Sequence, residues 1–175
     1  TNYKFTVTAL YSKGNYRVQS SDSNTLVITT KSANTYETEL SEVLNETASE
    51  ASKQLGLNKP FSSGRTVYYT KHGSTKDRTC FITCSFDNLN QKRKWSFYAF
   101  DDSISVYGAK IGMTENSAKQ KLLKNKWKVF TRYYNKATDS GFIIYKRGTY
   151  SMHVSQKHNK LNQISFFNNE GLYYS

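Results

Sequence analysis

The sequence predicts an α+β protein in which antiparallel sheet carries helices on one face. Aromatic residues make up 15% of the chain and there is one proline, a composition that favours strands. Apolar and polar residues alternate along much of the chain, while two segments repeat apolar residues every three or four positions. The first of these segments predicts a long helix at 35–55, and the second predicts a short helix at 114–125.

The length of 175 residues suits a single compact domain spanning 1–175. A helix followed by strands occurs twice along the chain, in 35–100 and again in 114–167. This order predicts, as an alternative, two helix-plus-meander units that form subdomains at 1–105 and 106–175. Residue identities do not repeat between the two units, so their similarity is one of element order alone.

Residues 3–30 are predicted to form three short strands before the long helix. In the first strand Tyr3 and Phe5 alternate with polar neighbours, as in a strand with one buried side. Turn-forming residues at 13–15 and at 21–24 separate the strands. We expect either a small meander here or the edge of a larger sheet.

The helix predicted at 35–55 has an apolar stripe, and its five glutamates fall largely off that stripe. The stripe consists of Leu40, Val43, Leu44, Thr47, Ala48, Ala51 and Leu55. Asn34 or Thr35 can cap the start of the helix, and Gly56 is a natural stop. Pro60 prevents the helix from resuming. We therefore expect the stripe to pack on the sheet and the acidic side to face solvent. A docking surface, or contact with the basic part of the same chain, is the alternative for the acidic side.

Strands are predicted again between residues 65 and 107. The segment at 94–100 carries aromatic residues on both sides, which predicts a central strand. In the segment at 79–86, Cys80 and Cys84 share one face, about 13 Å apart from the rise per residue of a strand. That separation is too long for a disulfide, so we expect two buried thiols.

The short helix at 114–125 is predicted to begin at Thr114, whose hydroxyl can accept from a free amide of the first turn. Four segments follow it, and they are typical of an antiparallel meander. In the segment at 150–155 apolar and polar residues alternate, as expected of a sheet with one solvent-exposed side.

Positive charge dominates the last third of the chain. The formal net charge is +12, and residues 119–160 hold eleven Lys or Arg against Asp139 alone. Such a field attracts nucleic acid, anionic lipid or acidic wall polymers. Basic and aromatic residues alternate in these strands, and the pattern predicts a ligand-binding face made of Lys126, Trp127, Lys128, Arg132, Tyr134, Lys146 and Arg147. Rings on such a face can stack on bases or sugars while cations meet phosphates; alternatively, the rings form the core and the lysines its rim.

Motifs that carry chemistry are absent from the sequence. Neither an HExxH nor a CxxC pattern occurs, and no glycine-rich phosphate loop is present. The histidines, His72, His153 and His158, lie in no arrangement with Cys80 or Cys84 that spacing alone supports. We therefore predict a protein that is not an enzyme, with no catalytic residue, no metal site and no cofactor.

The segment around the short helix resembles a known family. Ile111, Gly112, Met113 and Thr114, followed by Ala118 and Leu122, are similar to the "IGMT" turn and helix of small bacterial envelope modules. Those modules have the β-lactamase-inhibitor-protein-like fold or the related fold of outer-membrane-assembly lipoproteins. The resemblance covers about residues 107–167, and it departs from the family in having one short helix rather than two.

The resemblance implies an extracytoplasmic, non-catalytic binding or scaffold module, secreted or on the cell surface, whose signal segment has been removed. The basic aromatic face would then recognise a protein or an anionic cell-wall polymer. A nucleic-acid-binding protein that uses the same surface is the alternative. No stretch of this sequence is long and apolar enough to span a membrane.

Overall fold

The structure, a computed structural model, divides the chain into two compact units, Thr1–Tyr36 and Glu37–Ser175. It describes residues 2–5, 7–8, 10–13, 16–21, 26–29, 38–74 and 79–168. The boundary expected at 105/106 is not where the chain divides. It lies inside the second unit, because the main sheet of that unit joins strands from both sides of it.

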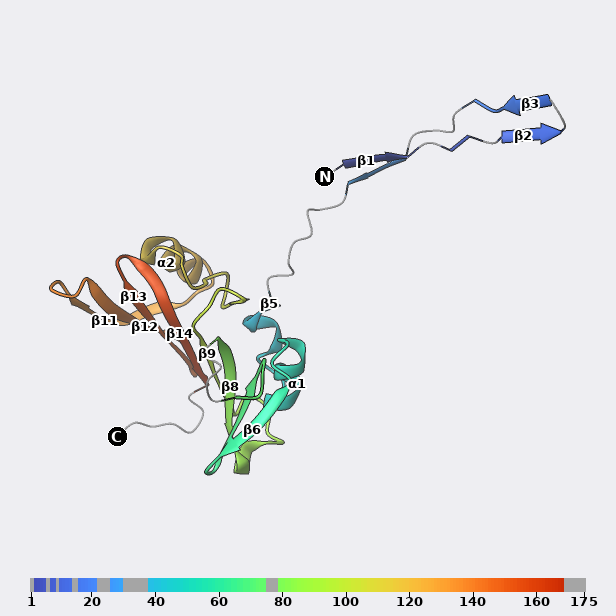
Figure 1. Ribbon diagram of the computed structural model, residues 1–175. Helices are drawn as coiled ribbons and strands as arrows, with labels where there is room; N and C mark the ends of the chain where they lie inside the picture. Colours follow the sequence, from blue (N-terminus) through green and yellow to red (C-terminus); the bar gives the residue numbers. More distant parts are fainter. Residues whose placement is uncertain are drawn as a thin grey trace. The chain divides into compact units, whose positions relative to one another are not determined.

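Within its described residues, the first unit has four short strands rather than three (Figure 1). They form two antiparallel pairs, β1 (Asn2–Phe5) with β4 (Leu26–Thr29) and β2 (Leu10–Lys13) with β3 (Tyr16–Gln19). The first predicted strand, at 3–10, corresponds to β1 alone, and the additional strand β2 begins at Leu10. The residues at the centres of both predicted turns, 14–15 and 22–24, lie outside the described residues.

The second unit is built on an eight-stranded antiparallel sheet with two helices, as the predicted α+β class requires. In sheet order its strands are β11 (Lys128–Asn135), β12 (Ser140–Arg147), β13 (Tyr150–Lys157), β14 (Lys160–Asn168), β9 (Ser96–Ala99), β8 (Cys80–Ser85), β7 (Thr66–Thr70) and β6 (Lys59–Ser63). Strand β9 pairs with both β8 and β14, which confirms the prediction that it is central.

Two helix-plus-meander units make up this sheet, and they meet where β9 pairs with β14. Helix α1 (Ala48–Gln54) precedes strands β6 to β9, and α2 (Glu115–Lys124) precedes strands β11 to β14. Sequence reasoning missed β6, which contains Pro60, the residue expected only to stop a helix. Pro60 is tolerated because β6 is an edge strand, paired on one side with β7.

The prediction of one continuous helix at 35–55 is wrong. Within its described part, a two-residue strand β5 (Thr38–Glu39) pairs with β10 (Ile104–Ser105), and a 3₁₀ turn η1 (Leu40–Val43) follows. Helix α1 starts afresh after Thr47, whose hydroxyl accepts from the amide of Glu50 at 3.3 Å. The Glu50 carboxylate accepts from the Thr47 amide at 3.0 Å, which completes a capping box. The apolar stripe survives the break, since its aliphatic and alanine members are all buried.

The short helix begins after Thr114, as predicted, and the Thr114 hydroxyl accepts from the amide of Ser117 at 3.3 Å. Both helices lie on one face of the sheet. That face holds the core, where α1 packs on β7 and β8, and Trp127 after α2 contacts Phe166 of β14. No helix in the described part of the chain is long and apolar enough to cross a membrane.

The opposite side of the sheet is called the open face, because no described element of the second unit covers it. Strand alternation assigns each residue to a face: β8 is buried at every second residue, starting with Cys80. Cys80 and Cys84 are free and buried on the helix-covered face, as predicted.

Candidate anion-binding site

Four cations line one hollow of about 370 Å³ at the ends of β11 and β12. This cationic hollow is formed by Lys126, Lys128, Val129, Phe130, Lys146, Arg147 and Gly148. Its four cations were all predicted to belong to the binding face. The structure therefore brings together the amines of three lysines and one guanidinium at the outer edge of the sheet.

The pairing of β11 with β12 places two of these lysines face to face. Lys128 is directly opposite Lys146 in the register, so both side chains leave the same side of the sheet. Like charges directly opposite each other on neighbouring strands destabilise a sheet. The Lys146 amine lies 3.6 Å from the centroid of the Phe130 ring, a cation–π contact that holds it beside Lys128.

Lys126 enters the hollow from the end of helix α2. The amide of Lys126 donates to the Leu123 carbonyl at 3.0 Å, and the Trp127 amide donates to the Leu122 carbonyl at 3.1 Å. These two bonds form a Schellman cap, in which Lys126 takes the left-handed position with φ 65°. A residue with a Cβ is strained there, so this lysine occupies the position at a cost in backbone energy.

The cations of the hollow have no counter-ion within the described part of the chain. The ion pairs recorded there, Arg65–Asp87, Arg132–Glu115 and His158–Asp139, involve none of them. Arg147 lies 5.0 Å over the Tyr107 ring, on a segment held by the Glu39 carboxylate. That carboxylate accepts from the Tyr107 and Gly108 amides at 2.6 and 2.9 Å, so its oxygens are occupied by hydrogen bonds from the backbone.

Trp127 does not belong to the binding surface, and its prediction as a ligand-binding residue is wrong. Its side chain is 1% exposed, with its ring 5.3 Å from that of Tyr107 and 6.1 Å from that of Phe166. It follows the helix cap directly, and the cap turns it into the core. A hydrophobic residue at this position commonly packs back on the helix end.

Arg132 and Tyr134 also lie away from the cationic hollow. Arg132 pairs with Ile143 in the register, which places it on the helix-covered side, where it contacts Glu115 of α2 at 2.8 Å. The Tyr134 hydroxyl donates to Asp139 at 2.8 Å, and this hydrogen bond raises the pKa of the phenol. The predicted face therefore splits between the two sides of β11.

A β-bulge causes this split. The register of β11 against β12 shifts between Val129 and Thr131, so Phe130 is an extra residue in its strand. Without the extra residue, Lys128 and Arg132 would share a side, as the alternation in the sequence predicts. With it, every residue after the bulge changes side. Sequence reasoning had no signal for the bulge.

A row of aromatic rings crosses the open face, and sequence reasoning missed it. Phe61 stacks on Tyr68 with centroids 4.9 Å apart, and Phe81 stacks on Tyr98 at the same distance. Tyr98 then meets Phe167 at 5.7 Å. These rings come from five strands, so no local pattern unites them. Contacts between rings on neighbouring strands of this kind stabilise a sheet.

Cys80 and His153 lie on opposite faces of the sheet, which excludes them as a catalytic pair. The Cys80 thiol donates to Asp101 at 3.2 Å, and burial raises its pKa to about 12, so it is protonated at neutral pH. His153 lies on the open face with its ring 5.0 Å from that of Phe167, and burial lowers its pKa.

No protein-family model matches the chain, and no curated protein matches it. A weak similarity exists to a solved structure, that of YjgB, a DUF4309 family protein from Bacillus subtilis. It covers 72% of this chain and 80% of that chain at 15% identity, with a TM-score of 0.37. At that TM-score the similarity supports no conclusion, so the binding site is interpreted from its own geometry.

Proposed function

We propose that this protein is a non-catalytic binding module that holds an anionic, phosphate-bearing polymer of the bacterial envelope, outside the cytoplasm. The observation that carries the proposal is the cationic hollow, where four cations meet with no described counter-ion. Two of the cations oppose each other across neighbouring strands, and a third occupies a strained backbone position. An anion bound between them would relieve their mutual repulsion.

The side chains of the hollow suit phosphate groups carried on a chain. Arg147 can donate two parallel hydrogen bonds to one phosphate, and the lysines can act as point charges on its neighbours. The hollow opens at the edge of the sheet beside Val129 and Phe130, which are 43% and 62% exposed. A polymer could therefore enter along the sheet edge, and the net charge of +12 would speed its arrival.

Charge reversal of the facing lysines tests the proposal directly. Lys128→Glu with Lys146→Glu should lower the affinity for inorganic polyphosphate by at least about 100-fold, because two attractive charges become repulsive. The matched control is Lys157→Glu with Lys160→Glu, another exposed pair of opposed lysines on the same sheet. Both variants change the net charge equally, so binding that depends only on net charge would fall equally in both.

Binding would be measured by calorimetry at several salt concentrations, with melting curves to verify folding. We expect Arg132→Gln to change polyphosphate affinity little, since its guanidinium lies across the sheet against Glu115. Equal losses in the two double variants, or no polyphosphate binding by the unmodified protein, would overturn the proposal. Tighter binding to single-stranded DNA of particular base sequence would favour nucleic acid as the ligand instead.

The location outside the cytoplasm has its own test. The full natural gene product, tagged at its C-terminus, should be found in the envelope or culture fraction of its host. Recovery with a cytoplasmic marker would contradict this part of the proposal, while leaving the anion site to be judged by the binding experiment.

A further inference from the structure

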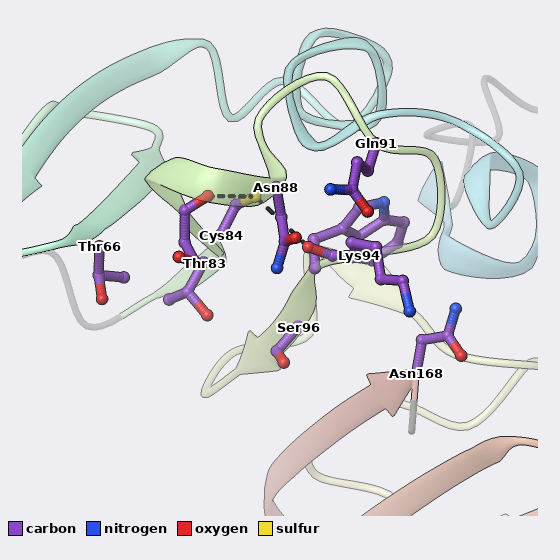
Figure 2. Close-up of a pocket in the computed structure, with 10 residues that line it drawn as sticks. Thr66, Thr83, Cys84, Asn88, Gln91, Lys94, Ser96 and Asn168 are labelled. Carbon is purple, nitrogen blue, oxygen red and sulfur yellow. Dashed lines mark hydrogen bonds between the residues drawn. The ribbon is translucent and has the colours of Figure 1, made fainter. Parts of the chain in front are cut away.

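A second hollow of about 470 Å³ lies between the open face and the loop after β8, and it is lined mainly by the first helix-plus-meander unit, with Asn168 of β14 at its rim. Figure 2 shows Thr83, Ser96, Asn88 and Lys94 converging on it from two strands and that loop. This polar hollow differs from the cationic hollow in its chemistry. Its polar lining consists mainly of hydroxyls and side-chain amides, and Lys94 is its single charged residue.

Several of these polar groups have no partner of their own. Within the described part of the chain, the side chains of Thr66, Thr83, Ser96 and Asn88 make no hydrogen bond. All four residues are half-buried, so water reaches them from one side only. Half-buried donors and acceptors that converge on one space can be satisfied together by a ligand with many hydroxyls.

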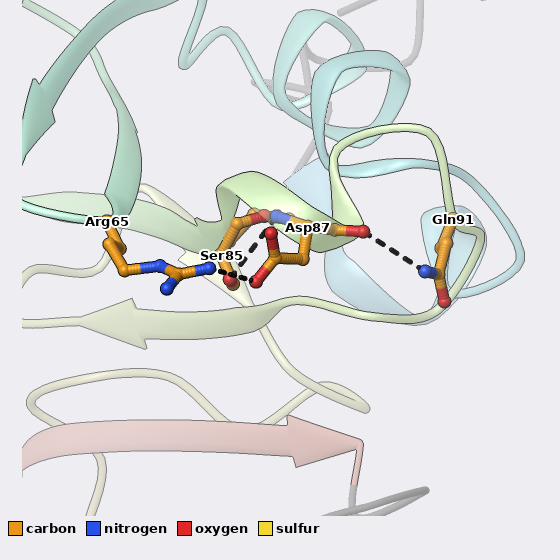
Figure 3. Close-up of polar contacts among 5 residues, drawn as sticks. Arg65, Ser85, Asp87 and Gln91 are labelled. Atoms are coloured by element: carbon orange, nitrogen blue, oxygen red, sulfur yellow. Dashed lines mark hydrogen bonds and ion pairs between the residues drawn. The ribbon is translucent and has the colours of Figure 1, made fainter.

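The loop that forms one wall of the polar hollow is held in place by polar contacts (Figure 3). Arg65 contacts the Asp87 carboxylate at 2.8 Å, and the Gln91 side-chain amide donates to the Asp87 carbonyl at 3.1 Å. The Trp95 indole donates to the Glu46 carbonyl at 3.0 Å, which ties the loop to the segment before α1. A site whose walls are already positioned loses less entropy when it binds.

The lining points to an uncharged, hydroxyl-rich ligand. No carboxylate lines this hollow, and one lysine offers too little positive charge to hold a polyanion. Apolar ligands would leave the hydroxyl and amide groups unpaired, at a cost of about 1–3 kcal/mol for each buried group. A sugar or polyol unit offers hydroxyls at the right density to pair with them.

Two lysines of the cationic hollow share one register row of the open face with two hydroxyl residues of the polar hollow. In this row Thr83 is opposite Ser96, Ser96 opposite Phe167, Phe167 opposite Ser151, Ser151 opposite Lys146, and Lys146 opposite Lys128. Three strand spacings separate β9 from β12, which is about 14 Å across the sheet. An extended polymer that lies across the strands would reach both hollows.

We infer that the polar hollow is a subsite for the uncharged polyol or sugar unit of the same phosphate polymer. This inference rests on the proposed function, because it assigns the repeat of the polymer: phosphates at the cationic hollow and a hydroxyl-bearing unit at the polar hollow. The ligand class is therefore a polyol-phosphate or sugar-phosphate polymer rather than a simple polyanion.

The experiment compares two probes of matched chain length and charge, poly(glycerol phosphate) and inorganic polyphosphate. The unmodified protein should bind poly(glycerol phosphate) on the order of tenfold more tightly, from one or two additional hydrogen bonds. Thr83→Val with Ser96→Ala removes two hydroxyls at nearly constant volume and should abolish that preference. The same variant should bind polyphosphate as before.

Thr138→Val with Ser140→Ala is the matched control, since it removes two hydroxyls from the far hairpin of β11 and β12. It should keep the preference for poly(glycerol phosphate). Equal affinity of the unmodified protein for both probes, or a preference that survives Thr83→Val with Ser96→Ala, would overturn the subsite while the cationic hollow stands. Failure to bind either probe would instead overturn the proposed function on which the subsite rests.

Discussion

Helices α1 and α2 end in the same cap, but the left-handed position is glycine in one and lysine in the other. In α1, Gly56 has φ 72°, its amide donates to Lys53, and the Leu57 amide donates to Ser52. In α2, Lys126 takes the position of Gly56, and Trp127 takes that of the buried Leu57. Only glycine adopts this backbone without strain. The helix-plus-meander unit that contains α2 therefore gives up some stability to place a cation at its hollow.

The outer strands of the two helix-plus-meander units also differ in whether they serve packing or present charge. Strand β6 is short, and its Phe61 stacks on a neighbouring ring of the sheet. Strand β11 has eight residues, seven of them exposed, and it carries Lys128 and Phe130 at the hollow. Two units with one element order thus present different chemistry at the two ends of one face: hydroxyls and amides at one hollow, and cations at the other. Substitutions at the caps, in the core and in the two hollows can break or sharpen this contrast.

The largest expected effect is on stability, at Trp127, the residue after the cap of α2. Trp127→Ala should lower the free energy of unfolding by about 3–5 kcal/mol, because it empties a large buried site. Trp127→Phe should cost much less, since the ring remains and the Trp127 indole N–H has no hydrogen-bond partner within the described structure. Urea denaturation measures both. A Trp127→Ala protein with unchanged stability would mean that this ring is not in the core.

An intermediate effect is expected from exchanging the two cap residues. Lys126→Gly should raise the free energy of unfolding by about 0.5–1 kcal/mol. This gain is the backbone strain that is relieved, minus the cost of the extra conformational entropy that glycine gives the unfolded chain. It should also weaken polyphosphate binding by up to about fivefold, as expected for loss of one exposed charge interaction. Stability and binding would thus move in opposite directions, which calorimetry and urea denaturation on the same sample can show.

The reciprocal change, Gly56→Lys, is the control. No atom lies within 4 Å of a Cβ placed at Gly56, so the substitution should cost backbone strain alone. We expect it to lower stability by a similar amount and to leave polyphosphate affinity nearly unchanged. If Lys126→Gly were destabilising, the cap would not be under strain, and the contrast between the two helices would fail.

The smallest expected effect is the dependence of stability on pH through His153. Burial lowers its pKa below the value of about 6.5 for an unfolded chain, so on acidification the unfolded chain takes up this proton first. The contribution of His153 to stability is therefore full above that value, and it is lost as the pH falls through the unfolded and then the folded pKa. Melting curves between neutral and mildly acidic pH should show the loss, and His153→Gln should flatten it. An equal slope in the variant would contradict this assignment.

Much of the second unit could be predicted from its sequence, because the signals are local. The Thr114 cap, the alternation through Met152 and Val154, and the central position of the strand at 96–99 each depend on a few neighbouring residues. A local signal for the start of α1 also exists in the sequence, because Thr47 stands three residues before Glu50, as in a capping box. The longer apolar stripe concealed this signal. An edge strand that contains Pro60 gives too weak a pattern to detect.

The sequence by itself determined which side chains were available to bind a polyanion: lysine and arginine at alternating positions, within strands that could be located. Tertiary structure alone decided which of them meet. The bulge at Phe130 reverses the alternation, so Lys128 faces Lys146 while Arg132 turns to Glu115. Pairing between β9 and β14 then joins the two units and aligns Thr83 and Ser96 with those lysines. Register is set by contacts between strands far apart in the chain, and local sequence does not encode them.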